Sequence, residues 1–122
     1  MSAGAGRRVL LVEDTADVRM IVRFVLEDAG LTVDEAVDGT AGLLTARTLP
    51  DVVLLDVQLP DLDSPDVLRA LRNDPVTQGL AVVFLTAGDR RGDDELQALG
   101  AAGVLHKPFD VATFADELAA LT

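Results

Sequence analysis

The sequence predicts an α/β fold of five strand–helix units, (βα)5, built on a doubly wound parallel sheet with the strand order 2-1-3-4-5. Two observations predict it. Short apolar runs alternate along the chain with stretches whose apolar residues recur at helical spacing. The chain has 122 residues, 49% of them hydrophobic, which suits one domain with a substantial core. Helices should then cover both faces of the sheet in a three-layer sandwich.

Each element has a local signal. The first helix carries Val18, Ile21, Val22 and Val25 on one face, and Gly30 follows it where a helix C-terminus favours glycine. The second helix is short because proline at position 50 stops it. The expected strand–helix pairs are 9–12 and 15–29, 31–37 and 40–48, 51–56 and 64–73, 80–86 and 91–99, and 102–106 with a last helix.

The third and last helices have the clearest start signals. The segment 64–66, Ser-Pro-Asp, offers a cap, a proline in the first turn and an acid on the helix dipole. Asp110 is expected to cap the last helix, with Phe109 and Phe114 spaced as a hydrophobic staple. Asp61 and Asp63, which precede the third helix, are expected to be solvated or capping acids.

Composition limits the function classes. The net charge of −11, from 21 acids and 10 bases, argues against nucleic-acid binding by this domain, because phosphate backbones require clustered Lys and Arg. No apolar stretch approaches the length of a membrane span, and the N-terminus lacks the apolar region of a signal peptide. The absence of cysteine fits a cytoplasmic location. Residues 1–7 are expected to form a flexible tail, and 8–122 one domain.

Reactive side chains collect at the carboxyl ends of the predicted strands. Asp56 ends a strand buried on both faces, where a charge is costly unless something pairs with it. Glu13 and Asp14 end the neighbouring first strand, while Thr86 and Lys107 end the fourth and fifth. Two charges about 4 Å apart repel by about 4 kcal/mol at an effective dielectric near 20, so these acids need a proton or a cation. Mg²⁺ prefers oxygen ligands and shares its shell with phosphate.

The motifs VLLVEDTADVR, VVLLDVQLPDLD, FLTA and HKPF, in this order and spacing, resemble the receiver domain of two-component response regulators. The resemblance covers residues 8–121 and implies a flavodoxin-like fold. It implies that Asp56 accepts a phosphoryl group from a histidine kinase or phosphotransfer protein. It also implies that Thr86 is the switch hydroxyl and that Lys107 pairs with a phosphoryl oxygen.

The same resemblance implies a Mg²⁺ site. Glu13 and Asp14 match the acid pair that holds the ion, with Asp14 and Asp56 as direct ligands and the backbone carbonyl of Gln58 as another. The Lys107–Pro108 bond resembles the cis peptide of the family. Phosphoryl transfer to a carboxylate depends on positioning and charge neutralisation, which Mg²⁺ and an ammonium supply. We therefore expect a phosphoryl acceptor with self-catalysed transfer and dephosphorylation only, and no further enzyme activity.

The sequence departs from the family pattern at two positions. Val104 stands where an aromatic residue is usual, and a β-branched valine has no ring to swing and a stiff χ1. The read-out is then expected to depend on Thr86 and on backbone shifts. Ser64 stands where glycine is common, so the loop after the acceptor is expected to be stiffer. Gln58 and Gly88 match the positions that tune dephosphorylation in the family.

The resemblance also indicates partners. Receivers meet a downstream protein target or their own output domain, and a homodimer would use the last two helices and the strand 102–106. The sequence stops at the last helix, which fits either a stand-alone, chemotaxis-regulator-like protein or a receiver excised from a longer one.

Three alternatives stay open at this point. The fold could serve as a scaffold that is not phosphorylated. A nucleotide- or flavin-binding module has a similar topology, but the acidic loop 13–17 would repel an anion. An aspartyl-phosphate phosphatase would place a second acid where Gln58 stands.

Overall fold

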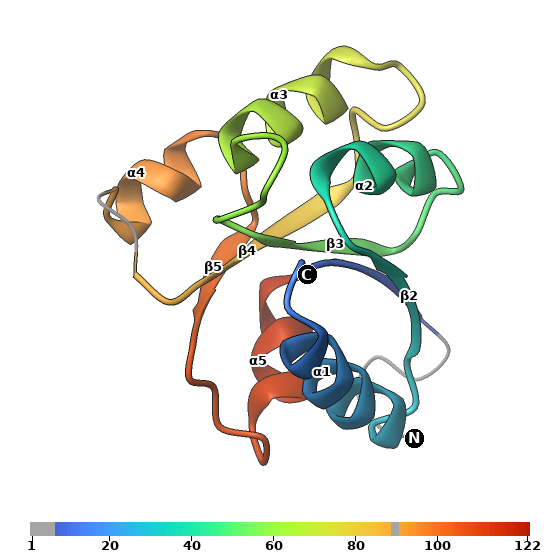
Figure 1. Ribbon diagram of the computed structural model, residues 1–122, viewed down its shortest axis with the longest axis vertical. Coiled ribbons are helices and arrows are strands. Elements are labelled where there is room, and N and C mark those ends of the chain that lie inside the picture. Colours follow the sequence, from blue (N-terminus) through green and yellow to red (C-terminus); the bar gives the residue numbers. More distant parts are fainter. Residues whose placement is uncertain (1–6, 89–90) are drawn as a thin grey trace.

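The computed structural model describes residues 7–88 and 91–122 and contains a five-stranded sheet in the order β2-β1-β3-β4-β5 (Figure 1). All four strand pairings are parallel, so the predicted fold and order are confirmed. The strands are β1 (Arg8–Val12), β2 (Thr32–Ala36), β3 (Val52–Asp56), β4 (Ala81–Thr86) and β5 (Gly103–His106). The helices are α1 (Ala16–Asp28), α2 (Gly39–Ala46), α3 (Ser64–Asn73), α4 (Asp93–Ala98) and α5 (Phe114–Leu121).

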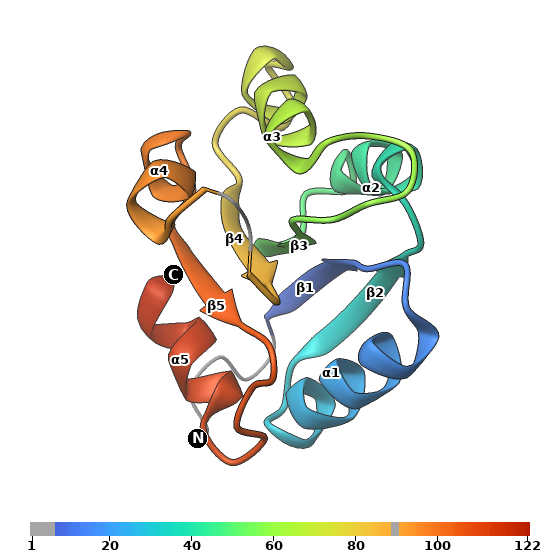
Figure 2. The ribbon, with the colours of Figure 1, turned by 60° about the vertical axis from the view of Figure 1, so that its left-hand side comes forward.

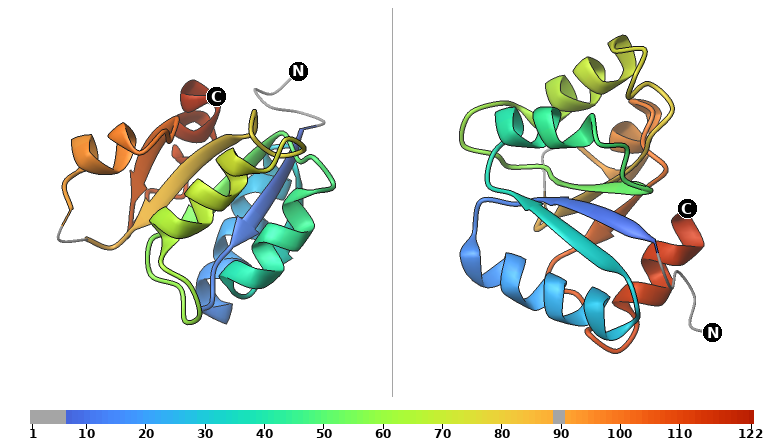
Figure 3. Two further views of the ribbon diagram at one scale, coloured as in Figure 1. Left: turned by 90° about the horizontal axis from the view of Figure 1, so that it is seen from above. Right: turned by 90° about the vertical axis from the view of Figure 1, so that its right-hand side faces the viewer.

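Helices cover both faces of the sheet, with α1 and α5 on one side and α2, α3 and α4 on the other (Figures 1 and 3). Alternation along each strand divides the core between these layers. Val9 and Leu11 pack with α1 and α5, while Leu10 and Val12 pack with the opposite helices. Every residue of β3 is buried, as the continuous apolar run predicts. No helix within the described ranges has the length and apolarity that a bilayer crossing requires.

Strand register brings the predicted site residues to one edge. Val12 lies beside Leu55, so the residues that follow them, Glu13 and Asp56, are neighbours across the β1–β3 pair. On the other side of the sheet centre, Thr86 lies beside His106, and Lys107 follows directly. The carboxyl ends of β1, β3, β4 and β5 therefore meet at the same edge, where parallel sheets of this type bind ligands.

Of the predicted flexible tail, residues 1–6 lie outside the described residues. Arg7 is already engaged: its carbonyl accepts the Thr32 N–H at 2.9 Å, and its guanidinium donates to the Thr122 hydroxyl at 2.9 Å. Gly30 ends α1 with a φ of 93°, a left-handed conformation that glycine adopts without strain.

The predicted role of Ser64 as a helix cap is wrong. Asp63 is the N-cap of α3, and Ser64 is the first helical residue. Its fully buried hydroxyl donates instead to the main-chain carbonyl of Asp56. The hydroxyl points back into the protein because the loop folds against the end of β3. Ser64 thus ties the start of α3 to the end of the strand that carries the predicted acceptor.

The predicted capping of the last helix by Asp110 is also wrong in position. A turn intervenes, in which the Asp110 carboxylate accepts the Ala112 N–H at 2.9 Å, and α5 begins only at Phe114 with Thr113 as its N-cap. The predicted packing of the two aromatic rings is confirmed, since the ring centroids of Phe109 and Phe114 are 4.5 Å apart.

Candidate functional site

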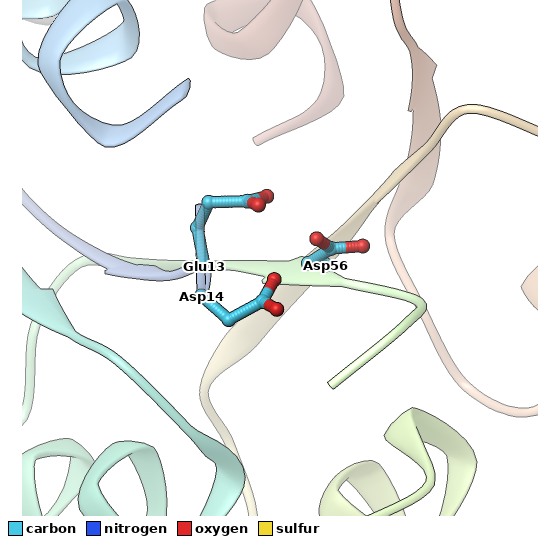
Figure 4. Close-up of side chains that lie close together, drawn as sticks. All are labelled: Glu13, Asp14 and Asp56. Carbon is cyan, nitrogen blue, oxygen red and sulfur yellow. The ribbon is translucent and has the colours of Figure 1, made fainter. Parts of the chain in front are cut away.

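Three carboxylates meet at the carboxyl edge of the sheet. Glu13 and Asp14 follow β1, Asp56 ends β3, and one oxygen from each lies within 4.8 Å of the others. Figure 4 shows the three side chains gathered at the ends of these two strands. Glu13 is fully buried and Asp56 is only 4% exposed, whereas Asp14 faces solvent. Three acids so close together require positive charge or protons nearby.

The electrostatics of Glu13 reflect this crowding. Burial and, after it, the hydrogen bond with Asp56 raise the pKa of Glu13 to about 7, although Lys107 acts in the opposite direction. Burial disfavours the charged form because the carboxylate loses its hydration. In the metal-free protein the cluster therefore holds a proton through much of the acid and neutral range. A cation that displaces this proton would restore the charge.

Lys107 supplies one positive charge to the cluster. Its ammonium lies 2.9 Å from Oε2 of Glu13 and 3.1 Å from Oδ2 of Asp56. Burial acts to lower the pKa of Lys107, but the hydrogen bond to Glu13 and the attraction of Asp56 raise it above the usual lysine value. A single ammonium among three carboxylates leaves the site negative. The oxygen-only donor set, with its surplus negative charge, fits a hard divalent cation.

The other predicted residues, Gln58 and Thr86, lie at the same edge of the sheet. Gln58 donates its main-chain N–H to Oδ1 of Asp56 at 2.9 Å. Thr86 is buried at the end of β4, its hydroxyl accepts the Gly88 N–H at 2.9 Å, and its carbonyl accepts the Lys107 N–H at 2.7 Å. A hydroxyl in this arrangement still has its own proton to donate. An open cleft of about 350 Å³ is lined by Asp14, Thr15, Asp56, Gln58, Leu59, Pro60, Ala87 and Lys107.

The chain resembles known proteins over nearly its whole length. Residues 9–119 match the response regulator receiver domain.

The chain belongs to this family.

Response regulator PleD of Caulobacter vibrioides is 44% identical over 112 residues, covering 84% of this chain and 23% of PleD. The DNA-binding dual master transcriptional regulator RpaA of Synechocystis sp. is 38% identical over 107 residues, covering 85% of this chain and 44% of RpaA. The receiver therefore spans less than half of these longer relatives.

Solved receivers have the same architecture. Chemotaxis response regulator CheY4 of Vibrio cholerae superposes with a TM-score of 0.86 at 30% identity, covering 95% of this chain and 98% of CheY4. The receiver domain of sensor histidine kinase PA1611 from Pseudomonas aeruginosa gives a TM-score of 0.84 at 28% identity, covering 96% of this chain and 98% of that domain. That structure carries a magnesium ion coordinated in the active site cleft. Membership of the receiver family sets aside the flavin, nucleotide and phosphatase alternatives.

The structure brings together the side chains that the sequence predicts for this receiver site. Glu13, Asp14, Asp56 and Lys107 lie in contact range, with Thr86 at the adjacent strand end. The Lys107–Pro108 bond is cis, as expected. Val104, at the position where the family usually has an aromatic residue, is partly buried and packs against the core layer of α2, α3 and α4. The small valine side chain fills part of that layer and offers no ring to the surface.

The structure also assigns Asp61 of this receiver a capping role that the sequence left open. Its carboxylate accepts the N–H of Gly39 at 2.8 Å, the N–H of Thr40 at 3.0 Å and the Thr40 hydroxyl at 2.7 Å. The hydrogen bond from Thr40 and those from the backbone lower the pKa of Asp61 to about 2. The loop that follows the predicted acceptor is therefore fastened to the N-terminus of α2.

Proposed function

We propose that this receiver accepts a phosphoryl group on Asp56 and acts as a phosphorylation-dependent switch of protein contacts. The observation that carries the proposal is the placement of the Asp56 carboxylate. It is nearly buried, within contact range of two other acids and hydrogen-bonded to the Lys107 ammonium. An isolated acid with this burial would be costly, and the arrangement suits a group that gains and loses charge.

The proposed step moves a phosphoryl group between two nucleophiles. A carboxylate oxygen of Asp56 forms the new O–P bond, while the N–P bond to a histidine of a kinase or phosphotransfer protein breaks and its electron pair returns to the imidazole. The product is an acyl phosphate. In this proposal Lys107, which already bonds to Asp56, would pair with one phosphoryl oxygen, and Thr86, at the end of β4, would donate to another. The chain performs no further chemistry in this proposal beyond its own phosphorylation and dephosphorylation.

We propose that Mg²⁺ is the cofactor. Asp14 and Asp56 would be its carboxylate ligands, Glu13 would supply charge beside them, and the Gln58 carbonyl would be a further oxygen ligand. The magnesium ion in the active site cleft of the PA1611 receiver supports this proposal. When bound, the ion would neutralise the oxygens of the transferring group.

A mass measurement tests the proposal. Wild-type protein incubated with a small-molecule acyl phosphate and Mg²⁺ is expected to gain the mass of one phosphoryl group, located by peptide mapping in the segment that contains β3. Omission of Mg²⁺ and the Asp14→Asn variant serve as matched controls, and both are expected to reduce the adduct strongly. Protein that neither gains this mass nor responds to beryllofluoride, an acyl-phosphate mimic that does not hydrolyse, would support the scaffold alternative and overturn the proposal.

An apolar surface beside the site suits the phosphodonor protein. Two adjoining grooves, of about 450 and 470 Å³, share Ile21 of α1 and Val111 of the turn before α5. The first is flanked by exposed Phe24, and the second reaches Lys107 of the site itself. A donor helix lying along α1 would bury this surface and bring its histidine towards Asp56. We therefore propose these grooves as the donor contact.

Phe24→Ser is expected to slow transfer from a phosphohistidine protein about tenfold, because truncating a residue that anchors an interface costs more than about 1 kcal/mol. The variant should react with a small acyl phosphate at the wild-type rate, because Phe24 lies outside the acidic cluster. Leu44→Ser removes an equally exposed side chain, from α2, and is the matched control. Equal slowing by both variants, or none by either, would contradict donor contact along α1.

The downstream partner of the receiver can be proposed only as a class of protein. The longer relatives make an output domain or a separate protein target the expected partner. A homodimer through α4, β5 and α5 is a further proposal. The exposed acids Asp93, Asp94, Asp116 and Glu117 lie on these two helices, so a second copy would have to overcome like charge. A cytoplasmic location follows from the proposed pathway.

A further inference from the structure

We propose that Arg19 is a positioning residue that holds the loop between β1 and α1 in the conformation that receives the cation. One nitrogen of its guanidinium, Nη1, donates to the main-chain carbonyls of both Glu13 and Asp14, at 2.8 and 2.9 Å. These are the two residues whose side chains form the acid pair. The inference rests on the proposed Mg²⁺ site, and it concerns how this chain shapes that site.

Arg19 is itself held in place from the neighbouring strand. Its Nε lies 3.2 Å from Oε1 of Glu35 on β2, and the arginine side chain is only 18% exposed. Figure 2 shows α1 running alongside β2, which is why a residue in the second turn of the helix can reach both the strand and the loop. The guanidinium therefore links three segments of chain through one rigid fork.

Hydrogen bonds from the main-chain N–H groups of the loop also help to hold it in this conformation. The Glu13 N–H donates to the Ala36 carbonyl at 3.0 Å, and the Thr15 N–H donates to the Glu13 carboxylate at 3.3 Å. Arg19 adds the two carbonyl groups that these bonds do not use. Fixing both carbonyls restricts the main chain of Glu13 and Asp14, whose carboxylates lie within 4.8 Å of an Asp56 oxygen. Groups that orient metal ligands in this way commonly change affinity about 10–100-fold when removed.

Whether the loss of Arg19 weakens or strengthens Mg²⁺ binding distinguishes a positioning role of this residue from an effect of its charge alone. Arg19 is a cation bonded to the main chain of Glu13 and Asp14, so removing only its charge would make the surroundings of the site more negative and favour Mg²⁺ binding. Removing a positioning group would release the loop and bind Mg²⁺ more weakly. We expect the second effect to be larger, because the bonds to the two carbonyls are direct whereas the charge is shared with Glu35.

The test compares Mg²⁺ dissociation constants measured by calorimetric titration of the complete chain. Arg19→Gln is expected to bind Mg²⁺ about tenfold more weakly than wild type. Arg23→Gln is the matched control, because Arg23 lies one turn further along α1 and also pairs with Glu35, whereas its partners Glu27 and Glu35 lie on α1 and β2 and not in the loop. We expect its affinity to stay within about twofold of wild type.

Glu35→Gln leaves Arg19 in the chain but weakens the ion pair that holds its guanidinium. We expect this variant to lose less Mg²⁺ affinity than Arg19→Gln. If Arg19→Gln fails to fold, a loss of affinity in Glu35→Gln supports the inference and unchanged affinity contradicts it. Arg19→Lys should recover part of the lost affinity, since an ammonium can still donate to a carbonyl. Tighter or unchanged Mg²⁺ binding in Arg19→Gln would overturn the inference. If the wild-type protein itself shows no Mg²⁺ binding, the proposed metal site is wrong and the inference about Arg19 fails with it. Failure of the metal site is thus told apart from failure of the Arg19 inference, in which the wild-type protein still binds Mg²⁺.

Discussion

Asp56→Asn is expected to take up no phosphoryl group from an acyl phosphate while becoming more stable than the wild-type protein in the absence of metal. The amide is no nucleophile for phosphorus, so the mass increase should vanish completely. The gain in stability has a separate cause. Asp56 lies against Glu13 and within 4.8 Å of Asp14, and removing its charge relieves a repulsion that Lys107 only partly offsets. The expected gain is on the order of 1 kcal/mol.

The local geometry should survive this substitution, because asparagine retains the oxygen that accepts the Gln58 N–H. Urea unfolding without Mg²⁺ and with excess Mg²⁺ measures both effects. Wild type should be stabilised by the ion, whereas Asp56→Asn should respond much less, since it has lost a ligand. Asp94→Asn, an exposed position on α4, controls for the loss of one negative charge. A destabilised Asp56→Asn would mean that the attraction of Lys107 outweighs the repulsion within the cluster.

The metal-free protein is expected to lose stability as the pH rises from about 4.5 to about 7, the interval between the ordinary and the native pKa of Glu13. In this interval the folded protein holds a proton on Glu13 that the unfolded chain has already released. Folding is therefore favoured at the acid end, and the advantage is lost as the pH passes the native pKa. A difference of one proton gives a slope of at most about 1.4 kcal/mol per pH unit.

Mg²⁺ binding should show the opposite trend over the same interval. The ion must displace the proton, so its affinity is expected to rise up to about tenfold per pH unit below pH 7 and to level off above it. Calorimetric titrations at several pH values provide the measurement. Glu13→Gln cannot hold this proton and should flatten both profiles. A wild-type profile as flat as that of Glu13→Gln would show that Glu13 titrates near its ordinary pKa.

The sequence was sufficient for the sheet and for most of the site. The apolar runs define the five strands, and the parallel α/β rules then determine their order and the edge where Asp56, Glu13, Asp14 and Lys107 meet. These residues could be predicted because each lies at the end of a strand or within two residues of it. Their place depends on the backbone topology and hardly at all on loop conformation.

Contacts between loops could not be predicted in this way. The hydroxyl of Ser64 bonds to Asp56 and not to its own helix, and Asp61 caps α2, a helix that precedes it by some 20 positions in the chain. Arg19 has an ordinary helical position in the sequence, and only the approach of β2 reveals its two carbonyl partners. The sequence pattern also did not predict how deeply each acid is buried. Glu13 is completely buried, whereas its neighbour Asp14 is exposed.

The hydrogen bonds between Asp61 and the N-terminus of α2 should withstand a lower pH than the charge of the acidic cluster. With a pKa of about 2, this carboxylate stays ionised and keeps its three hydrogen bonds in conditions where Glu13 has long been neutralised. At a mildly acidic pH the acidic cluster would therefore lose negative charge on Glu13, while the contact between Asp61 and α2 stayed intact. A return to neutral pH would restore the charge of the cluster by loss of a single proton, without refolding of the domain.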